Sequence, residues 1–306
     1  MNGALSLRFT AQAQLDVRRI TRELSELQRQ VASGSKSNDL RGLGGEAAQV
    51  LNASTMRAAA DARASSLNQL EARFGVQAAA LNQAAAANQN LANAIRDAIS
   101  ANDGRGVATE LNLSFISGVA AMNETWNGQP MFAGERQSGP PIRVSTLEAL
   151  ETATGAQLFD EADRPQILDL GAGSPLKLSD KASELSTEMF DAMRELHLMI
   201  EGMGGQIGQP IDAATTDQLV AFAERFEAVS GTFTNAEGRT GQLAQRFAAE
   251  RTRQVERSNL LTKEIGERAD ADIAMISIRI STLLVQYEAA AKTFGDLSKL
   301  SLLDYI

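Results

Sequence analysis

Apolar residues recur at alternating three- and four-residue steps in two stretches near the ends of the chain. We call these stretches the N-terminal seam (Ala13, Val17, Ile20, Leu24, Leu27 and Val31) and the C-terminal seam (Ile273, Ile276, Ile280, Leu283, Tyr287, Ala290, Phe294 and Leu297). Such spacing places the side chains along one stripe of an α-helix. A helix with one narrow apolar stripe depends on packing for its stability, so the seams predict paired assembly surfaces.

The same periodicity predicts further long helices inside the two ends. One begins near Glu46, after a Gly-rich break at 42–45, and ends at Asn102-Asp103-Gly104, where Asn and Gly tolerate the left-handed conformation of a helix C-cap. Another covers about 107–123, and a third covers about 181–203. A long helix follows a second Gly-rich break at 202–208, with Leu219, Phe222 and Phe226 on one stripe.

The centre of the chain has a different character. All six prolines lie between residues 130 and 210, so nothing in the two ends forbids long helices. Two runs, SGPPIRVSTL and RPQILDLGAGSPLKL, are short, β-prone and punctuated by Gly and Pro. We therefore predict a mainly α fold, a long antiparallel coiled coil and helical bundle formed by the two ends, with a small β-containing insertion in the middle.

These observations predict three domains. Residues 1–45 and 265–306 are expected to form an inner terminal coiled coil that becomes ordered on assembly. Residues 46–136 and 180–264 are expected to form an outer helical bundle, and residues 137–179 a small exposed domain. The N-terminal end is basic, with seven Lys and Arg against four Asp and Glu over 1–45, which favours pairing with a more acidic C-terminal helix.

Composition excludes several functions. The chain has no cysteine and a single histidine, which removes disulfides, thiolate sites and most histidine-based triads. A net charge of −9 argues against binding the phosphate backbone of nucleic acids. The N-terminus does not read as a conventional signal peptide, and no unbroken run of 18 apolar residues predicts a membrane span.

Candidate chemical sites are weak. His197 has only Glu201 one helical turn away, whereas a metal site needs three or four ligands. The acidic cluster of Asp160, Glu161, Asp163 and Asp169 does not have the spacing of a calcium loop. The glycines at 42–45 lack the strand and the Lys-Ser/Thr of a phosphate loop. We expect no catalytic residue, no metal, no cofactor and no enzymatic activity.

Four segments resemble the flagellin superfamily. The central NETWNGQPMFAGE contains an Asn-Gly-x-x-x-Phe-Ala-Gly signature that is similar to that of the hook-associated protein three family. The C-terminal LSKLSLLDYI resembles the ending of the same family, and QVASGSKSNDL and GRTGQLAQRFAAERTR resemble superfamily segments near the two ends. The residues that carry the resemblance are Asn127, Gly128, Phe132, Ala133, Gly134, Leu302, Leu303, Asp304 and Tyr305.

The resemblance implies a structural subunit of the bacterial flagellum that joins hook to filament. It implies export through the flagellar type III apparatus to the extracellular flagellum. Expected partners are copies of the chain in a ring-like layer, the neighbouring hook-associated protein, flagellin and an export chaperone, with no nucleic acid and no membrane. Three alternatives stay open: a filament flagellin, an intracellular coiled-coil adaptor or chemosensory-type hairpin, and an enzyme carried on the helical scaffold.

Overall fold

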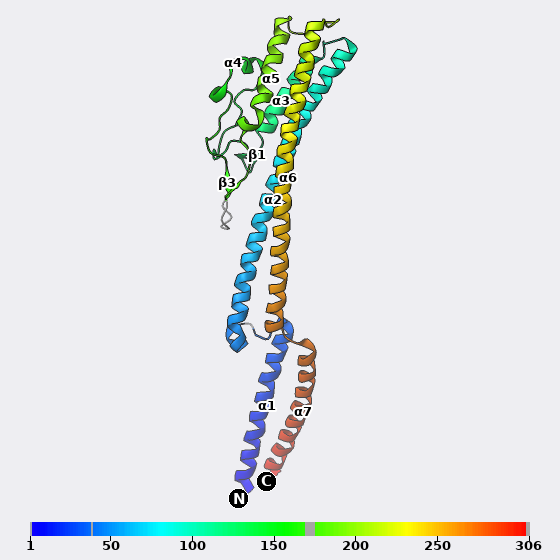
Figure 1. Cartoon of the computed structure of the whole chain (residues 1–306). Helices are drawn as coiled ribbons and strands as arrows, with labels where there is room; N and C mark the ends of the chain where they lie inside the picture. Colours follow the sequence, from blue (N-terminus) through cyan, green and yellow to red (C-terminus); the bar gives the residue numbers. More distant parts are fainter. Residues whose placement is uncertain (1, 38, 169–174, 304–306) are drawn as a thin grey trace. The chain divides into compact units, whose positions relative to one another are not determined.

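The computed structural model describes residues 2–37, 39–168 and 175–303, and it confirms the mainly α fold (Figure 1). The chain divides into two compact units. Unit 1 comprises Met1–Ala64 and Thr252–Ile306, and unit 2 comprises Ser65–Arg251. Two helices, α2 (Ala47–Ala101) and α6 (Ala213–Ala269), contribute residues to both units.

Unit 1 contains the two terminal helices. Helix α1 (Asn2–Ser33) and helix α7 (Ile273–Leu303) lie side by side and antiparallel in Figure 1, as the blue and red ribbons. A 3₁₀ helix, η1 (Leu40–Glu46), leads from α1 to α2. The parts of α2 and α6 within this unit also pair, because the Ser258 hydroxyl bonds Asp61 and Arg268 bonds Gln49.

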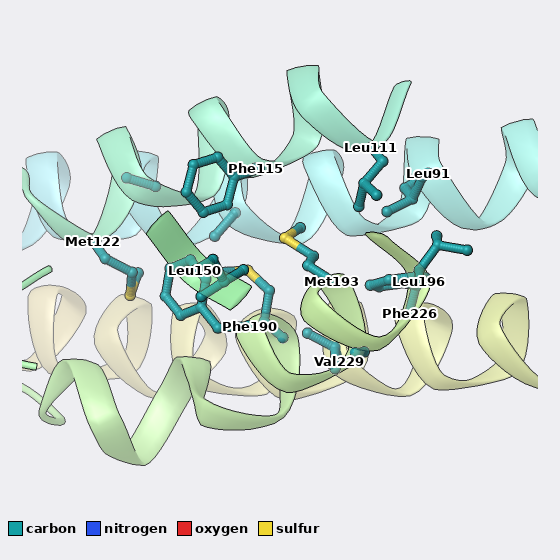
Figure 2. Packing of buried hydrophobic residues seen from close by; sticks show 14 of the residues in the cluster. Leu91, Leu111, Phe115, Met122, Leu150, Phe190, Met193, Leu196, Phe226 and Val229 are labelled. Atoms are coloured by element: carbon teal, nitrogen blue, oxygen red, sulfur yellow. The ribbon is translucent and has the colours of Figure 1, made fainter. Parts of the chain in front are cut away.

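Unit 2 is a helical bundle with short irregular segments. Helices α3 (Val107–Met122), α4 (Leu147–Thr152) and α5 (Ala182–Gly202) pack with α2 and α6. Their core is built from aliphatic, Met and Phe side chains that interdigitate from every helix (Figure 2). The residues labelled there are Leu91, Leu111, Phe115, Met122, Leu150, Phe190, Met193, Leu196, Phe226 and Val229.

The helix boundaries predicted from the sequence are confirmed. Helix α2 is rich in Ala, has no Pro and has a single Gly, Gly75, so intrinsic propensity favours its length. It stops at Ala101 because Asn102 takes a left-handed conformation with φ of 53°. Helices α3 and α5 begin and end within a residue or two of their expected positions.

The small β-containing insertion predicted for the centre is confirmed, and its described strands are short. Strands β3 (Ile167–Leu168) and β4 (Leu176–Lys177) form one short antiparallel pair, and the 3₁₀ helix η2 (Gly155–Gln157) precedes them. The first β-prone run makes only an isolated bridge, Ile142 to Phe159. A further pair, β1 (Thr125–Trp126) and β2 (Gln129–Pro130), lies before the predicted insertion. Its Asn-Gly turn is the sequence signal that identifies such a hairpin.

The central segment packs into the helical core of unit 2. Ile142, Leu147, Leu150 and Leu158 are buried in the same cluster as the helices. A second cluster forms where Leu168, Leu176 and Leu178 meet α2 and α6 around the stacked rings of Phe74 and Phe247, whose centroids are 5.5 Å apart. The segment therefore shares a core with the bundle, because each of its turns directs an apolar side chain toward the helices.

Candidate assembly surfaces

Among the side chains that the structure describes, an apolar interface and an exposed ion pair connect α1 and α7. Ile20 of α1 and Ile276 and Leu283 of α7 are buried. The Arg279 guanidinium donates two hydrogen bonds to Glu23, at 2.8 and 3.1 Å. Exposed ion pairs contribute less than about 1 kcal/mol, so the apolar contacts supply most of the stability of this pair.

Helix α7 carries a second apolar stripe that no described residue covers. Met275, Ile278 and Val285 recur at three- and seven-residue steps, and 67–70% of each side chain is exposed. We call these three residues the outer stripe of α7. A two-helix pair has only one shared interface, so a helix that is apolar on two sides must leave one of them open. The outer stripe is therefore an apolar surface of unit 1 that is open to a partner.

The seam residues divide by burial as follows. Ile20, Ile276 and Leu283 are buried; Val17, Leu24, Leu27, Ile280, Ala290 and Phe294 are partly buried; Val31, Ile273 and Tyr287 are exposed. The side chains of Ala13 and Leu297 lie outside the described residues. The buried members thus lie near the middle of α1 and in the first half of α7.

A network around Lys36 joins the segments where α1 ends and α7 begins. The Lys36 amide donates to the Ala269 carbonyl at 2.7 Å, and the Ala271 amide donates to the Gly34 carbonyl at 2.9 Å. The Lys36 ammonium donates to the Arg268 carbonyl at 2.7 Å. A cation at this position satisfies the free carbonyls at the C-terminus of α6 and interacts favourably with the helix dipole. The joint is thus fixed by backbone hydrogen bonds within unit 1.

The Phe-Ala-Gly half of the central signature is buried and connects two other segments of the chain, whereas Asn127 and Gly128 are exposed. Phe132 and Ala133 are fully buried. The Phe132 carbonyl accepts from the Ala182 amide at 2.8 Å, and the Ala133 carbonyl accepts from the Ala162 amide at 2.9 Å. These bonds connect the motif to the start of α5 and to the central segment. Phe132 and Ala133 therefore have a structural place in unit 2, because their side chains are covered and their carbonyls are bonded within the chain.

Gly134 continues the motif in a conformation that requires glycine. Its φ is 64°, and a Cβ added there would lie 2.4 Å from the Arg164 carbonyl oxygen. Asn127 and Gly128 take positive φ of 51° and 77° and form the turn between β1 and β2. Leu302 and Leu303 are the last residues of α7, and their side chains are outside the part that the structure describes. Asp304 and Tyr305 lie outside the described residues.

An ion-pair cluster ties the central segment to α5 and α6. The Asp180 carboxylate forms ion pairs with Lys177 at 2.9 Å and with Arg239 at 2.7 Å. Lys177 also forms an ion pair with Glu184 at 2.6 Å. Burial alone would raise the pKa of Asp180, but hydrogen bonds from Lys177 and Arg239 hold that pKa below its ordinary value. The charged carboxylate is thus the form that the fold favours.

Other candidate chemical residues have structural partners. His197 is buried, and its Nε2 lies 3.2 Å from the Glu151 carboxylate of α4. Asp160 is paired with Arg136 at 2.5 Å and with Arg143 at 2.9 Å.

The remaining residues of the acidic cluster and the glycines at 42–45 lie in the following structural surroundings. Glu161 accepts from the Ser183 amide at 3.0 Å, at the start of α5. Asp163 is exposed, and Asp169 is outside the described residues. The glycines at 42–45 lie in η1, where the Asp39 carboxylate accepts from the Gly42 amide at 2.8 Å. This is a turn between two helices.

Two further properties bear on chemistry and location. Within the part of the chain that the structure describes, no three His, Cys, Asp or Glu residues gather as metal ligands. Helix α7 is, over Ile273–Gly295, long and apolar enough to cross a membrane by length and composition, with a mean hydropathy of 1.2 and 11% of that window buried. The same length and composition suit a helix whose second apolar side awaits a protein partner.

The fold defines a class of helical protein in which the two terminal helices are paired and the middle of the sequence forms a compact bundle. No family model matches the chain, and no curated protein matches it. Among solved structures, it is similar to a chain from Vibrio parahaemolyticus assigned to the flagellar hook-associated proteins, with a TM-score of 0.57 and 13% identity. That match covers 76% of this chain and all of the other. A Bacillus cereus FlgL structure matches at a TM-score of 0.41 and 12% identity, over 62% of this chain and 96% of that one.

Proposed function

We propose that this chain is a structural subunit of the bacterial flagellum that joins hook to filament. The proposal is supported by the fold shared with the Vibrio structure and by the signature at Asn127–Gly134. In this role the subunit forms a ring-like layer between a neighbouring hook-associated protein and flagellin. It reaches that place through the flagellar export channel, held by an export chaperone beforehand.

The outer stripe of α7 is the observation that carries the proposal. Covering a Met, Ile or Val side chain contributes roughly 1.5–3 kcal/mol each. In a free monomer the three residues of the stripe gain none of this. Neighbouring subunits that cover the stripe would stabilise the terminal pair and each other at once. Assembly and ordering of the terminal helices are coupled for this reason.

A charge on the outer stripe tests the assembly role. Ile278→Asp should leave the α1–α7 pair intact, since Ile278 is not part of its interface, and should abolish incorporation into flagella. Ser277→Asp is the matched control, because it adds the same charge at an exposed position of α7 away from the stripe. Electron microscopy of cells that carry each variant reads the outcome. Normal filaments with Ile278→Asp would remove the stripe from the assembly surface.

The junction position has its own test. Cells that lack the protein should keep hooks, lose attached filaments and release flagellin into the medium. Purified protein added to short filament seeds should not elongate them, because a junction subunit presents different surfaces to its two neighbours. Elongation of seeds over micrometres would identify a filament flagellin instead. Full protease protection of both ends in a verified monomer would support the adaptor alternative.

A further inference from the structure

Two neighbouring helices of unit 2 share a long stretch without any charge. Helix α2 has no Asp, Glu, Lys or Arg between Arg73 and Arg96, and α3 has none after Glu110. The two stretches lie side by side, since the Ser114 hydroxyl donates to the Ala87 carbonyl at 2.9 Å. In a chain of which 22% of residues are charged, this is a marked local depletion.

The exposed side of this helix pair is apolar and amide-rich. Leu113 and Ile116 project from α3 with 53% and 51% of their surface exposed. Their exposed neighbours on both helices are small or uncharged. We call the whole set the α2–α3 face: Gln83, Ala86, Asn90, Asn112, Leu113, Ile116 and Ala120.

The other helices of the same unit show the contrast. Arg225 of α6 is bound by Glu188 at 2.9 Å and by Glu195 at 2.5 Å, both from α5. Arg96 of α2 pairs with Glu227 of α6. Surfaces that stay in water usually intersperse charges of both signs, whereas the centres of protein interfaces lose them. The α5–α6 side has the first pattern and the α2–α3 face has the second.

We propose that the α2–α3 face contacts a second copy of this chain. The formal charge of −9 makes two copies repel each other, and carboxylates brought together at a contact would add to that cost. No carboxylate lies among the residues of the α2–α3 face, and Glu110 stands at its end, one turn before Leu113. Apolar ridges at Leu113 and Ile116 then supply contact area that excludes water. This proposal rests on one part of the proposed function, that copies of the chain stand beside one another in a layer.

The size of the face sets the strength expected of this contact. Residues 109–120 of α3 extend about 17 Å at 1.5 Å per residue, which is short for an interface that stands alone. Stable complexes bury about 1,200–2,000 Å² in total. The chain should therefore be monomeric through this face when dilute, and the contact should form where assembly holds copies close together.

A photoreactive amino acid placed at Ile116 tests the contact in assembled flagella. Illumination should trap a species of twice the 32.6 kDa chain mass, and mass spectrometry should find only this protein in it. The same probe at Val220 is the matched control, since Val220 is also an exposed aliphatic residue of unit 2 but lies on α6. It should give at least ten-fold less of the homodimeric product.

A second pair of variants tests the chemistry of the face. Leu113→Lys with Ile116→Lys should reduce incorporation into flagella at least ten-fold while leaving helicity by circular dichroism unchanged, because both positions are exposed. Val220→Lys should incorporate normally. A different protein trapped at Ile116, or no trapped species from flagella that do contain the chain, would overturn the inference and leave the proposed function standing. Absence of the chain from flagella would instead overturn the proposed function. In that case, illumination of concentrated purified protein that carries the probe at Ile116 tests the face without flagella. Failure to trap a homodimer there would also overturn the inference.

Discussion

Gly134→Ala should destabilise unit 2 far more than a comparable glycine substitution elsewhere. Gly134 has a φ of 64°, and an added Cβ would lie 2.4 Å from the Arg164 carbonyl oxygen and 3.2 Å from the Ala162 carbonyl oxygen. Real Cβ atoms do not approach backbone oxygens so closely. The central segment must therefore move away from the Phe132–Gly134 motif to admit the methyl group.

The expected magnitude follows from two contributions. A non-glycine residue in the left-handed region costs about 1–2 kcal/mol. Moving residues 162–164 also weakens the bonds from the Glu135 amide to the Arg164 carbonyl (3.0 Å) and from the Ala162 amide to the Ala133 carbonyl (2.9 Å). Each contributes about 0.5–1.5 kcal/mol. The sum is a loss of about 2–5 kcal/mol in the free energy of unfolding of unit 2.

Urea unfolding followed by tryptophan fluorescence measures this loss. Trp126 is the only tryptophan and packs against the core of unit 2, so its signal reports that unit. Gly155→Ala is the control: Gly155 has a φ of 49° and open space where its Cβ would stand, so only the backbone cost of about 1–2 kcal/mol applies. Equal losses in the two variants would refute the steric reasoning about the motif.

Three further predictions concern the packing and charge of each unit. Leu283→Asp should separate α1 from α7, because an unpaired carboxylate in an apolar interface costs several kcal/mol; circular dichroism should show lost helicity while the Trp126 unfolding midpoint stays unchanged. Phe247→Ala should lower the stability of unit 2 by about 3–5 kcal/mol through the cavity it leaves, measured by urea unfolding, and a loss below 1 kcal/mol would contradict its buried stacking. The pKa of Asp180 is lowered in the folded protein, so the carboxylate stabilises unit 2 fully above its unfolded pKa of about 3.8, and this stabilisation disappears as pH falls through the folded pKa. Asp180→Asn should therefore make the acid unfolding of unit 2 less dependent on pH. An unchanged pH profile would show that the pairing of Asp180 with Lys177 does not stabilise the fold.

The sequence alone determines the helices and their ends. Long Ala-rich stretches without proline specify α2, and Asn102-Asp103-Gly104 ends it because those residues accept conformations that others avoid. The terminal seams are readable for the same local reason, since a three- and four-residue period needs only the geometry of one helix. The placement of Ile20, Ile276 and Leu283 inside the α1–α7 pair is consistent with that period.

Tertiary structure decides which apolar side of a helix is covered and where irregular segments go. The periodicity of α7 is compatible with stripes on two sides, and only the position of α1 leaves Met275, Ile278 and Val285 open. Turn-rich composition does not reveal that residues 142–158 enter the bundle core, because burial there depends on contacts with distant helices. The burial of Phe132–Gly134 has the same origin. Local propensity acts over a few residues, whereas a core is made by segments that meet only after the chain has folded.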